Sequence, residues 1–139
     1  MRITRRLRRE EGSVAISGLL LATALVMLIG TGVDIAHAFI LRNDLTGIAK
    51  NAALAGSQQL DLNAWRQGTL ALDPQQAQQA ADQEIAANPR VDGTTTSTTT
   101  AVTVRVQEAF PTLMLRLVGM PNLTVTASAT AAPETPGRP

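Results

Sequence analysis

The feature that most constrains this chain is a long uncharged segment near its N-terminus. The 21 residues from Ser13 to Val33 carry no charge and include ten Leu, Ile or Val residues. As an α-helix at about 1.5 Å per residue, such a segment is roughly 32 Å long, which matches a bilayer hydrocarbon core of about 30 Å. A fully buried core helix is the alternative, but 139 residues are too few to surround it. The segment therefore predicts a membrane-spanning helix, and its ten large aliphatic residues favour insertion by roughly 3–6 kcal/mol.

The charges are distributed unevenly on the two sides of this segment. From Asp34 onward, nine carboxylates outnumber seven cations. Five of the twelve cations come before the segment: Arg2, Arg5, Arg6, Arg8 and Arg9. By the positive-inside rule these arginines are topology determinants that hold the N-terminus in the cytoplasm, where they contact anionic lipid. A nucleic-acid site is a poorer interpretation, because no aromatic residue is interleaved with the arginines.

A cleavable signal peptide is the main competing interpretation of this N-terminal region. Ala36-His37-Ala38 fits the A-x-A pattern of a signal-peptidase site, and a cut after Ala38 would release the rest of the chain. However, the apolar run is longer than the usual 7–15 residues, and Asp34 lies between the run and the site. We therefore expect the chain to be retained in the membrane.

Helical periodicity continues beyond the uncharged segment. A loose apolar stripe follows at steps of mostly three or four residues, and it consists of Ile35, Phe39, Leu41, Leu45, Ile48, Ala52 and Ala55. No proline occurs before Pro74, so one helix is expected from about Val14 to Gln59. Gly30 and Gly32 are the expected place for a bend or local melting. We expect this stripe to pack against the rest of the domain. The alternative is that it also packs against neighbouring subunits.

A Gln-rich second helix is expected after a polar, irregular stretch over residues 57–73. Asp73 is a suitable N-cap, Pro74 suits the first helical position, and Gln76 completes a capping box. The helix has a thin apolar face of Ala77, Ala80, Ala81 and Ile85, interrupted by Glu84, and it ends at Asn88-Pro89.

The C-terminal part of the chain has the patterns of β-strands. Val102, Val104 and Val106 alternate with polar residues, and Leu123–Ala131 alternates strictly, with Leu, Val and Ala on one face and Thr and Ser on the other. Between these strands, Phe110–Val118 predicts one or two helical turns closed by Gly119. The Thr-rich segment 94–100 is either a third strand or a disordered linker. The fold class predicted is α+β, with a long N-terminal helix that extends into a small domain of a second helix and a two- or three-stranded sheet.

The sequence carries no recognisable catalytic constellation. Cysteine is absent and His37 is the one histidine, so Cys-ligated metals, disulfides and a cysteine nucleophile are excluded, and a His-based metal site is improbable. Neither G-x-x-x-x-G-K-[ST] nor G-x-G-x-x-G occurs. Asp34 and His37, one helical turn apart, are expected to form a polar pair at the membrane exit. We predict no enzyme activity, no cofactor, no metal, and neither nucleic acid nor a small-molecule substrate as partner.

The N-terminal motif resembles TadE/TadG-like proteins of the tight-adherence (Flp) pilus system. The resemblance rests on the basic residues followed by Glu10-Glu11-Gly12-Ser13-Val14-Ala15-Ile16, on Asp34, and on Leu45 followed by Ala49-Lys50-Asn51-Ala52-Ala53-Leu54-Ala55. It is firm over residues 5–60, looser over 100–131, and absent from the Gln-rich middle.

The resemblance implies a pseudopilin-like accessory subunit of pilus assembly in the bacterial inner membrane. In TadE-like members a prepilin peptidase cuts after a glycine, which here corresponds to a cut between Gly12 and Ser13, and a Glu follows five residues later. The corresponding residue here is Ser17, which has no carboxylate. This departure favours the TadG-like branch, whose N-terminal region resembles an uncleaved anchor.

Together these features predict a membrane-anchored accessory subunit that acts by helix and subunit packing, with the lipid bilayer and other pilus or secretion subunits as partners. The alternative is a secreted binding or adhesive domain released after Ala38. The expected organisation is a basic cytoplasmic leader (1–12), a transmembrane helix (13–34), its continuation (35–60), a small exported α+β domain (61–132) and a disordered tail (133–139).

Overall fold

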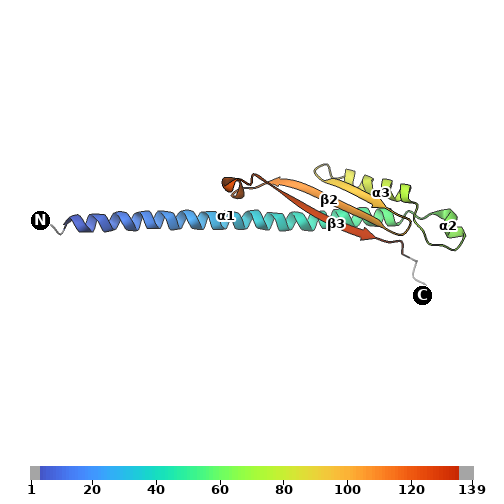
Figure 1. Ribbon diagram of the computed structural model, residues 1–139, viewed down its shortest axis with the longest axis horizontal. Helices are drawn as coiled ribbons and strands as arrows, with labels where there is room; N and C mark the ends of the chain where they lie inside the picture. Colours follow the sequence, from blue (N-terminus) through green and yellow to red (C-terminus); the bar gives the residue numbers. More distant parts are fainter. Residues whose placement is uncertain (1–3, 135–139) are drawn as a thin grey trace. The chain divides into compact units, whose positions relative to one another are not determined.

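A computed structural model describes the backbone of residues 4–134 and the side chains of residues 13–134. Its elements in chain order are α1 (Thr4–Ser57), α2 (Leu62–Arg66), α3 (Pro74–Ala86), β1 (Asp92–Ser97), β2 (Val102–Pro111), the 3₁₀ helix η1 (Leu115–Val118) and β3 (Asn122–Ala131) (Figure 1). A long apolar helix, a short second helix and a three-stranded antiparallel sheet confirm the predicted α+β class.

The chain divides into two compact units. Unit 1 contains α1 up to His37 together with Pro111–Pro121, the loop between β2 and β3. Unit 2 contains Ala38–Phe110 and the chain from Asn122 onward. The hydrogen bonds between Asp34 and the backbone of residues 113–115 lie within unit 1, whereas the main hydrophobic core lies within unit 2.

Helix α1 is helical throughout its 54 residues, as the absence of proline predicted. The expectation of local melting at Gly30 and Gly32 is wrong, because helical backbone continues through both positions. The isolated cost of a glycine in a helix is about 1 kcal/mol, which the hydrogen bonds of the surrounding turns can offset. At Gly30 the absence of a side chain also leaves room for the side chain of Met114.

The sheet of unit 2 has the strand order β1-β2-β3. Strands β1 and β2 are antiparallel, with a register that runs from Asp92 opposite Gln107 to Ser97 opposite Val102. The Thr-rich segment is therefore mostly a strand, and not the disordered linker that the sequence left open. A turn follows it, in which Thr98 N–H donates to the Ala101 carbonyl (2.9 Å).

The core of unit 2 forms where the valine face of β2 meets two helices. Val102, Val104 and Val106 are fully buried, as their alternation predicted. α3 contributes Ala77, Ala81 and Ile85, and Figure 1 shows α3 beside β1. α1 contributes Leu45, Ala49, Ala52 and Ala53. Small residues dominate both helical faces, so the helix backbones lie close to the sheet.

The predicted stripe on α1 is correct from Leu41 onward but wrong at its start. Leu45 and Ala52 are fully buried, whereas Ile35 is 50% and Phe39 is 63% exposed. At 3.6 residues per turn, Phe39 lies about 120° around the helix from Leu45, so it cannot share the buried face. The loose spacing in the sequence concealed this rotation.

The start of α3 follows the prediction, with one difference in its hydrogen bonds. Asp73 Oδ1 accepts from the backbone N–H groups of Gln75 (3.0 Å) and Gln76 (3.1 Å). In a capping box the Gln76 side chain would accept from the Asp73 N–H, but here Gln76 Nε2 donates to Asp73 Oδ2 (3.0 Å). The Asp73 N–H instead donates to the Gln59 carbonyl (2.9 Å).

The apolar segment Phe110–Val118 contains one helical turn after Phe110-Pro111, as predicted. β2 continues to Pro111, and only Leu115–Val118 form a helical turn, of the 3₁₀ type. Gly119 ends that turn in the left-handed region at φ +90°, as its place after the apolar segment predicted. The hairpin continues past β2 because Thr112 N–H donates to the Pro121 carbonyl (3.0 Å), which delays the helical turn.

α1 lies very close to its neighbours in unit 2 at Gly56. A Cβ built there would lie 2.8 Å from the Ala77 carbonyl oxygen and 3.0 Å from a Val102 methyl carbon. We expect Gly56→Ala to lower the free energy of unfolding by about 1–3 kcal/mol, because the added methyl overpacks the core. Denaturant titration of the detergent-solubilised chain, followed by fluorescence of the single tryptophan, Trp65, measures this change.

Gly47 provides the matched control on the same helix. No atom lies within 4 Å of a Cβ built there. We expect Gly47→Ala to raise stability by up to about 1 kcal/mol, through helix propensity alone. Equal effects of the two substitutions would contradict the close packing at Gly56.

Candidate functional site

The candidate site is built around Asp34, the first ionisable residue after the uncharged segment of α1. Its side chain is only 3% exposed. Oδ1 accepts the backbone N–H of Leu113 (2.7 Å), and Oδ2 accepts those of Met114 (2.8 Å) and Leu115 (3.0 Å). We call this set of three hydrogen bonds the Asp34 clamp.

The local structure of the β2–β3 loop (Pro111–Pro121) explains why three amides are available to one carboxylate. The first N–H groups of a helical turn have no partner within that turn, and Leu115 begins η1. Thr112 closes the loop on its other side, because its hydroxyl donates to the Met120 carbonyl. Hydrogen bonds to an ionised acceptor are stronger than neutral ones, so the clamp is a strong attachment for this loop.

Gly30 provides the second contact between α1 and the same loop. A Cβ built on Gly30 would collide with the Met114 side chain, whereas a Cβ built on Gly32 would meet no atom within 4 Å. Gly30 lies one turn before Asp34 and is itself buried. The two residues therefore form one docking face, on which Gly30 receives a side chain and Asp34 binds the backbone.

The sequence identified Asp34 as a polar site residue but not its backbone partners. It predicted a polar pair with His37, which lies one turn further along α1 with an exposed side chain and interacts electrostatically with Asp34. The amides of residues 113–115 are 79 to 81 positions away, and no local spacing rule connects them to Asp34. The signals available in the sequence were an acid directly after an apolar helical segment and a proline-flanked segment that contains a glycine.

The other predicted site residues come from the N-terminal region, and those after Thr4 lie at the beginning of α1. Arg2 lies outside the described residues, and Arg5, Arg6, Arg8, Arg9 and Gly12 have described backbone only. Ser13 lies within α1, and its carbonyl accepts the Ser17 hydroxyl (2.9 Å). The position at which the family resemblance leads one to expect a Glu is therefore occupied by a side chain bonded to its own helix.

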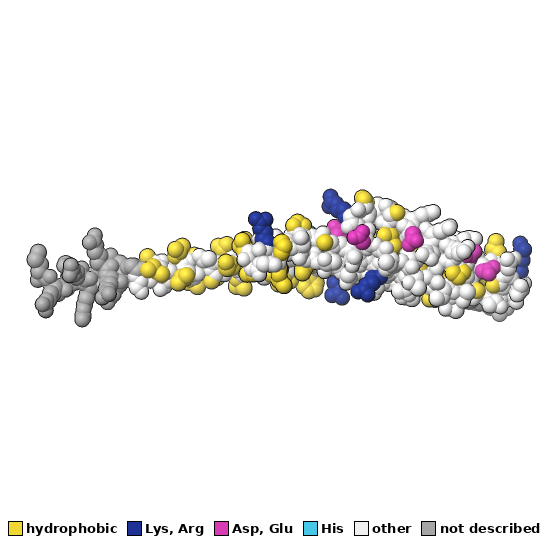
Figure 2. All heavy atoms as spheres, turned by 45° about the horizontal axis from the view of Figure 1, so that its top comes forward, with side chains coloured by type: hydrophobic (Ala, Val, Ile, Leu, Met, Phe, Trp, Pro, Cys, Tyr) yellow, Lys and Arg dark blue, Asp and Glu magenta, His cyan; other side chains and the backbone are white. Residues whose placement is uncertain are grey.

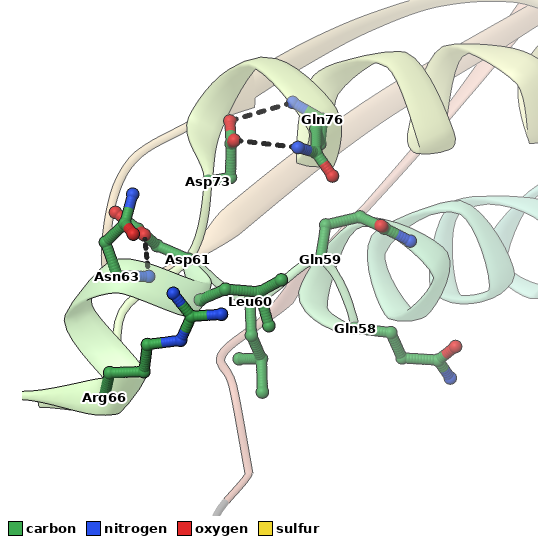
Figure 3. Close-up of a pocket in the computed structure, with 9 residues that line it drawn as sticks. Gln58, Gln59, Leu60, Asp61, Asn63, Arg66, Asp73 and Gln76 are labelled. Atoms are coloured by element: carbon green, nitrogen blue, oxygen red, sulfur yellow. Dashed lines mark hydrogen bonds between the residues drawn. The ribbon is translucent and has the colours of Figure 1, made fainter. Parts of the chain in front are cut away.

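A polar pocket of about 620 Å³ lies in unit 2, near the ends of three helices (Figure 3). Its lining includes Asp61, Arg66, Asp73 and several amide side chains. Both carboxylates cap helices: Asp61 accepts from Asn63 N–H (2.8 Å), as Asp73 does at the start of α3. These interactions give the pocket carboxylates a structural role. Among the described residues, no group of three or more His, Cys, Asp or Glu side chains could hold a metal ion.

The apolar part of α1 is distinct from the rest of the molecule. Every side chain from Ser13 to Ile29 is exposed, and Figure 2 shows the hydrophobic side chains along this part of the helix. The region Ser13–Ser57 contains an 18-residue window with a mean hydropathy of 2.3 and only 6% of it buried. By length and composition, this is a helix that can cross a membrane.

These observations define a small α+β protein with a long N-terminal helix whose first part is apolar and exposed. The family model of Tad-like Flp pilus-assembly proteins matches residues 36–131, and the chain belongs to this family. The match confirms a Tad-like pilus-assembly family and extends through the Gln-rich middle, which residue motifs alone did not connect to the family, while the N-terminal motif before residue 36 lies outside it. Searches of curated proteins and of solved structures returned no significant match. A role in pilus assembly follows from the family, and it suggests a function other than catalysis.

The Asp34 clamp gives a direct prediction for the mobility of the loop. We expect Asp34→Ala to increase hydrogen exchange at the Leu113, Met114 and Leu115 amides by roughly tenfold or more, since these donors lose a charged acceptor. Asp34→Asn keeps one acceptor oxygen and should have a smaller effect. Exchange is measured by mass spectrometry on the full chain in detergent.

Asp44→Asn is the control, because Asp44 is an exposed carboxylate on the same helix. It should leave exchange in the β2–β3 loop unchanged. If Asp34→Ala also left these three amides protected, the clamp would not be what holds the loop.

Proposed function

We propose that this chain is a membrane-anchored, pseudopilin-like accessory subunit of Tad-type pilus assembly. In this proposal it is a single-pass protein of the bacterial inner membrane, with the basic N-terminus in the cytoplasm and unit 2 exported. It acts by packing against other subunits of the pilus or secretion machine. The observation that carries the proposal is the uncharged, exposed stretch of α1, which continues without a helical break into the core of unit 2.

The polar side chains within that stretch support placement in lipid. Ser17, Thr23 and Thr31 each donate to the carbonyl four residues earlier, at 2.9, 2.9 and 2.8 Å. Their hydroxyl protons are thus paired within the helix, as a hydrocarbon environment requires. The backbone of an α-helix is likewise paired internally, so the stretch presents mainly apolar atoms to its surroundings.

Ser17 and the position of Ala38 within α1 both support an anchor that no peptidase removes. A Glu within the bilayer is costly unless it has a partner, and Ser17 avoids that cost while forgoing the pairing. The alternative cut after Ala38 falls in the interior of α1. It would begin the released chain two residues before Leu41, which packs on the core. We therefore propose retention without cleavage after Gly12 or Ala38.

The decisive experiment is the intact mass and N-terminal sequence of the protein recovered from the membrane fraction of its native host. An uncut chain that resists alkaline carbonate extraction supports the anchor. A membrane-bound chain that begins at Ser13 would establish processing and contradict the argument from Ser17. A soluble chain that begins at Phe39 would replace the anchor with a secreted binding or adhesive domain.

Charge substitutions in the apolar stretch test insertion directly. We expect the double variant Leu20→Arg and Leu21→Arg to move the chain out of the carbonate-resistant fraction, because each arginine near the centre of a span costs about 2.5–3.5 kcal/mol. Leu62→Arg is the matched control, since Leu62 is an exposed leucine in α2 of unit 2. Equal fractionation of the two variants and the unchanged chain would contradict a membrane span at this position.

Substitution of Ala38 by a bulky residue tests the alternative, in which signal peptidase releases a secreted domain after Ala38. A larger precursor accumulates in Ala38→Trp only if signal peptidase cuts after Ala38. The anchor proposal predicts an unchanged mass distribution, apart from the substitution itself.

A further inference from the structure

We propose that the β2–β3 loop is a second membrane contact, which inserts into the bilayer interface beside α1. This inference rests on the proposed function, because the loop can reach lipid in this way only if α1 spans the membrane. The occupant of the loop surface is the lipid bilayer itself, and not another protein chain.

The surface of the loop is unusually apolar for a connection between two strands. Four of its large side chains are between 55% and 70% exposed: Leu113, Leu117, Val118 and Met120. The sequence from Pro111 to Pro121 contains no carboxylate, and its one charged residue is Arg116. Loops exposed to water rarely present so many large apolar side chains together, and an exposed apolar patch usually marks a binding surface.

The loop is attached to α1 at the point where the uncharged segment ends. Met114 packs at Gly30, and the Asp34 clamp holds the adjacent backbone. Val26 and Met27, which lie one turn before Gly30 on the same side of α1, are 59% and 47% exposed. Within unit 1 the apolar surface of the loop is therefore continuous with the apolar surface proposed to face lipid.

The backbone of the loop is suited to an environment with little water. Non-helical backbone near hydrocarbon must have its polar groups paired. The N–H groups of Leu113, Met114 and Leu115 are paired with Asp34. Four more are paired with carbonyls inside the loop: those of Thr112, Leu117, Gly119 and Met120. Pro111 and Pro121 have no N–H to satisfy.

The charge of the loop also favours lipid. Arg116 is exposed within η1, among the apolar side chains. A long basic side chain can place its aliphatic part along apolar surface and its guanidinium among lipid phosphates. A depth near the headgroups suits both this arginine and the position of Asp34 at the end of the uncharged segment.

Single-cysteine labelling of the full chain tests the proposal cleanly, because the natural sequence has no cysteine. We would attach an environment-sensitive fluorophore at Leu117→Cys in the loop, Leu20→Cys in the proposed span and Thr96→Cys on β1 of unit 2. All three side chains are exposed, so labelling should not disturb packing. Each protein is reconstituted at one copy per nanodisc, in phosphatidylcholine with phosphatidylglycerol that carries either shallow or deep quenchers.

The expected result is three different depths. The Leu117 label is quenched several-fold more by shallow than by deep quenchers, the Leu20 label shows the reverse, and the Thr96 label is quenched by neither. A Leu117 label in water together with a Leu20 label in lipid would overturn the loop contact and leave the anchor intact. If both labels were in water, the proposed function would fail together with the loop contact.

A protein partner is distinguished by varying the number of copies. If the Leu117 label left water only at several copies per nanodisc, without lipid quenching, the loop would be a subunit interface and the proposal would be wrong. As a second variant, Val118→Glu combined with a label at Leu113→Cys should move that label toward water. Leu62→Glu, which adds the same charge at an exposed leucine of α2, should not.

Discussion

Close contact between helix backbone and sheet is the interaction on which unit 2 depends. Aromatic residues make up only 2% of the sequence, so large aromatic side chains cannot fill the space between the helices and the sheet. Ala49, Ala52, Ala53 and Gly56 instead bring the backbone of α1 close to the other layers of the unit. Dispersion attraction is weak per atom pair and falls steeply with distance, so a core of small residues is stabilised only when its layers lie close together. The caps at Asp61 and Asp73 fix where α2 and α3 begin, which keeps α3 within that narrow space.

Unit 1 uses a different means of attachment. Its helix is exposed on nearly every side, and only Gly30 and Asp34 between Ser13 and His37 are buried. Two residues one turn apart thus hold an eleven-residue loop, one by leaving room for Met114 and the other by accepting three N–H groups. The attachment is polar at the backbone and leaves the large apolar side chains of the loop on the outside.

The sequence predicted those features that depend on neighbouring residues. The valine alternation of β2, the N-cap at Asp73 and the uninterrupted α1 all follow from local rules, and the structure confirms them. Features that depend on distant residues were missed or left open, including the strand order and the partners of Asp34. Gly30 shows the difference well: local propensity suggested a weak point in the helix, whereas the reason for the glycine is Met114, far along the chain. The exposure of Phe39 has a different and local origin, since Phe39 lies about 120° around α1 from Leu45, a rotation that the loose apolar spacing concealed.

The long sequence separation of the Asp34 clamp has a consequence for the order in which this protein matures. The carboxylate must wait for donors that lie 79 to 81 residues later, so it stays without them throughout synthesis of most of the chain. Closing such a long interval costs chain entropy, which is recovered only after the intervening helices and strands have formed. A nascent or truncated chain therefore carries a bare negative charge where the finished protein has a buried one. The attachment of the β2–β3 loop to α1 through Asp34 therefore forms only after Leu113, Met114 and Leu115 have been synthesised.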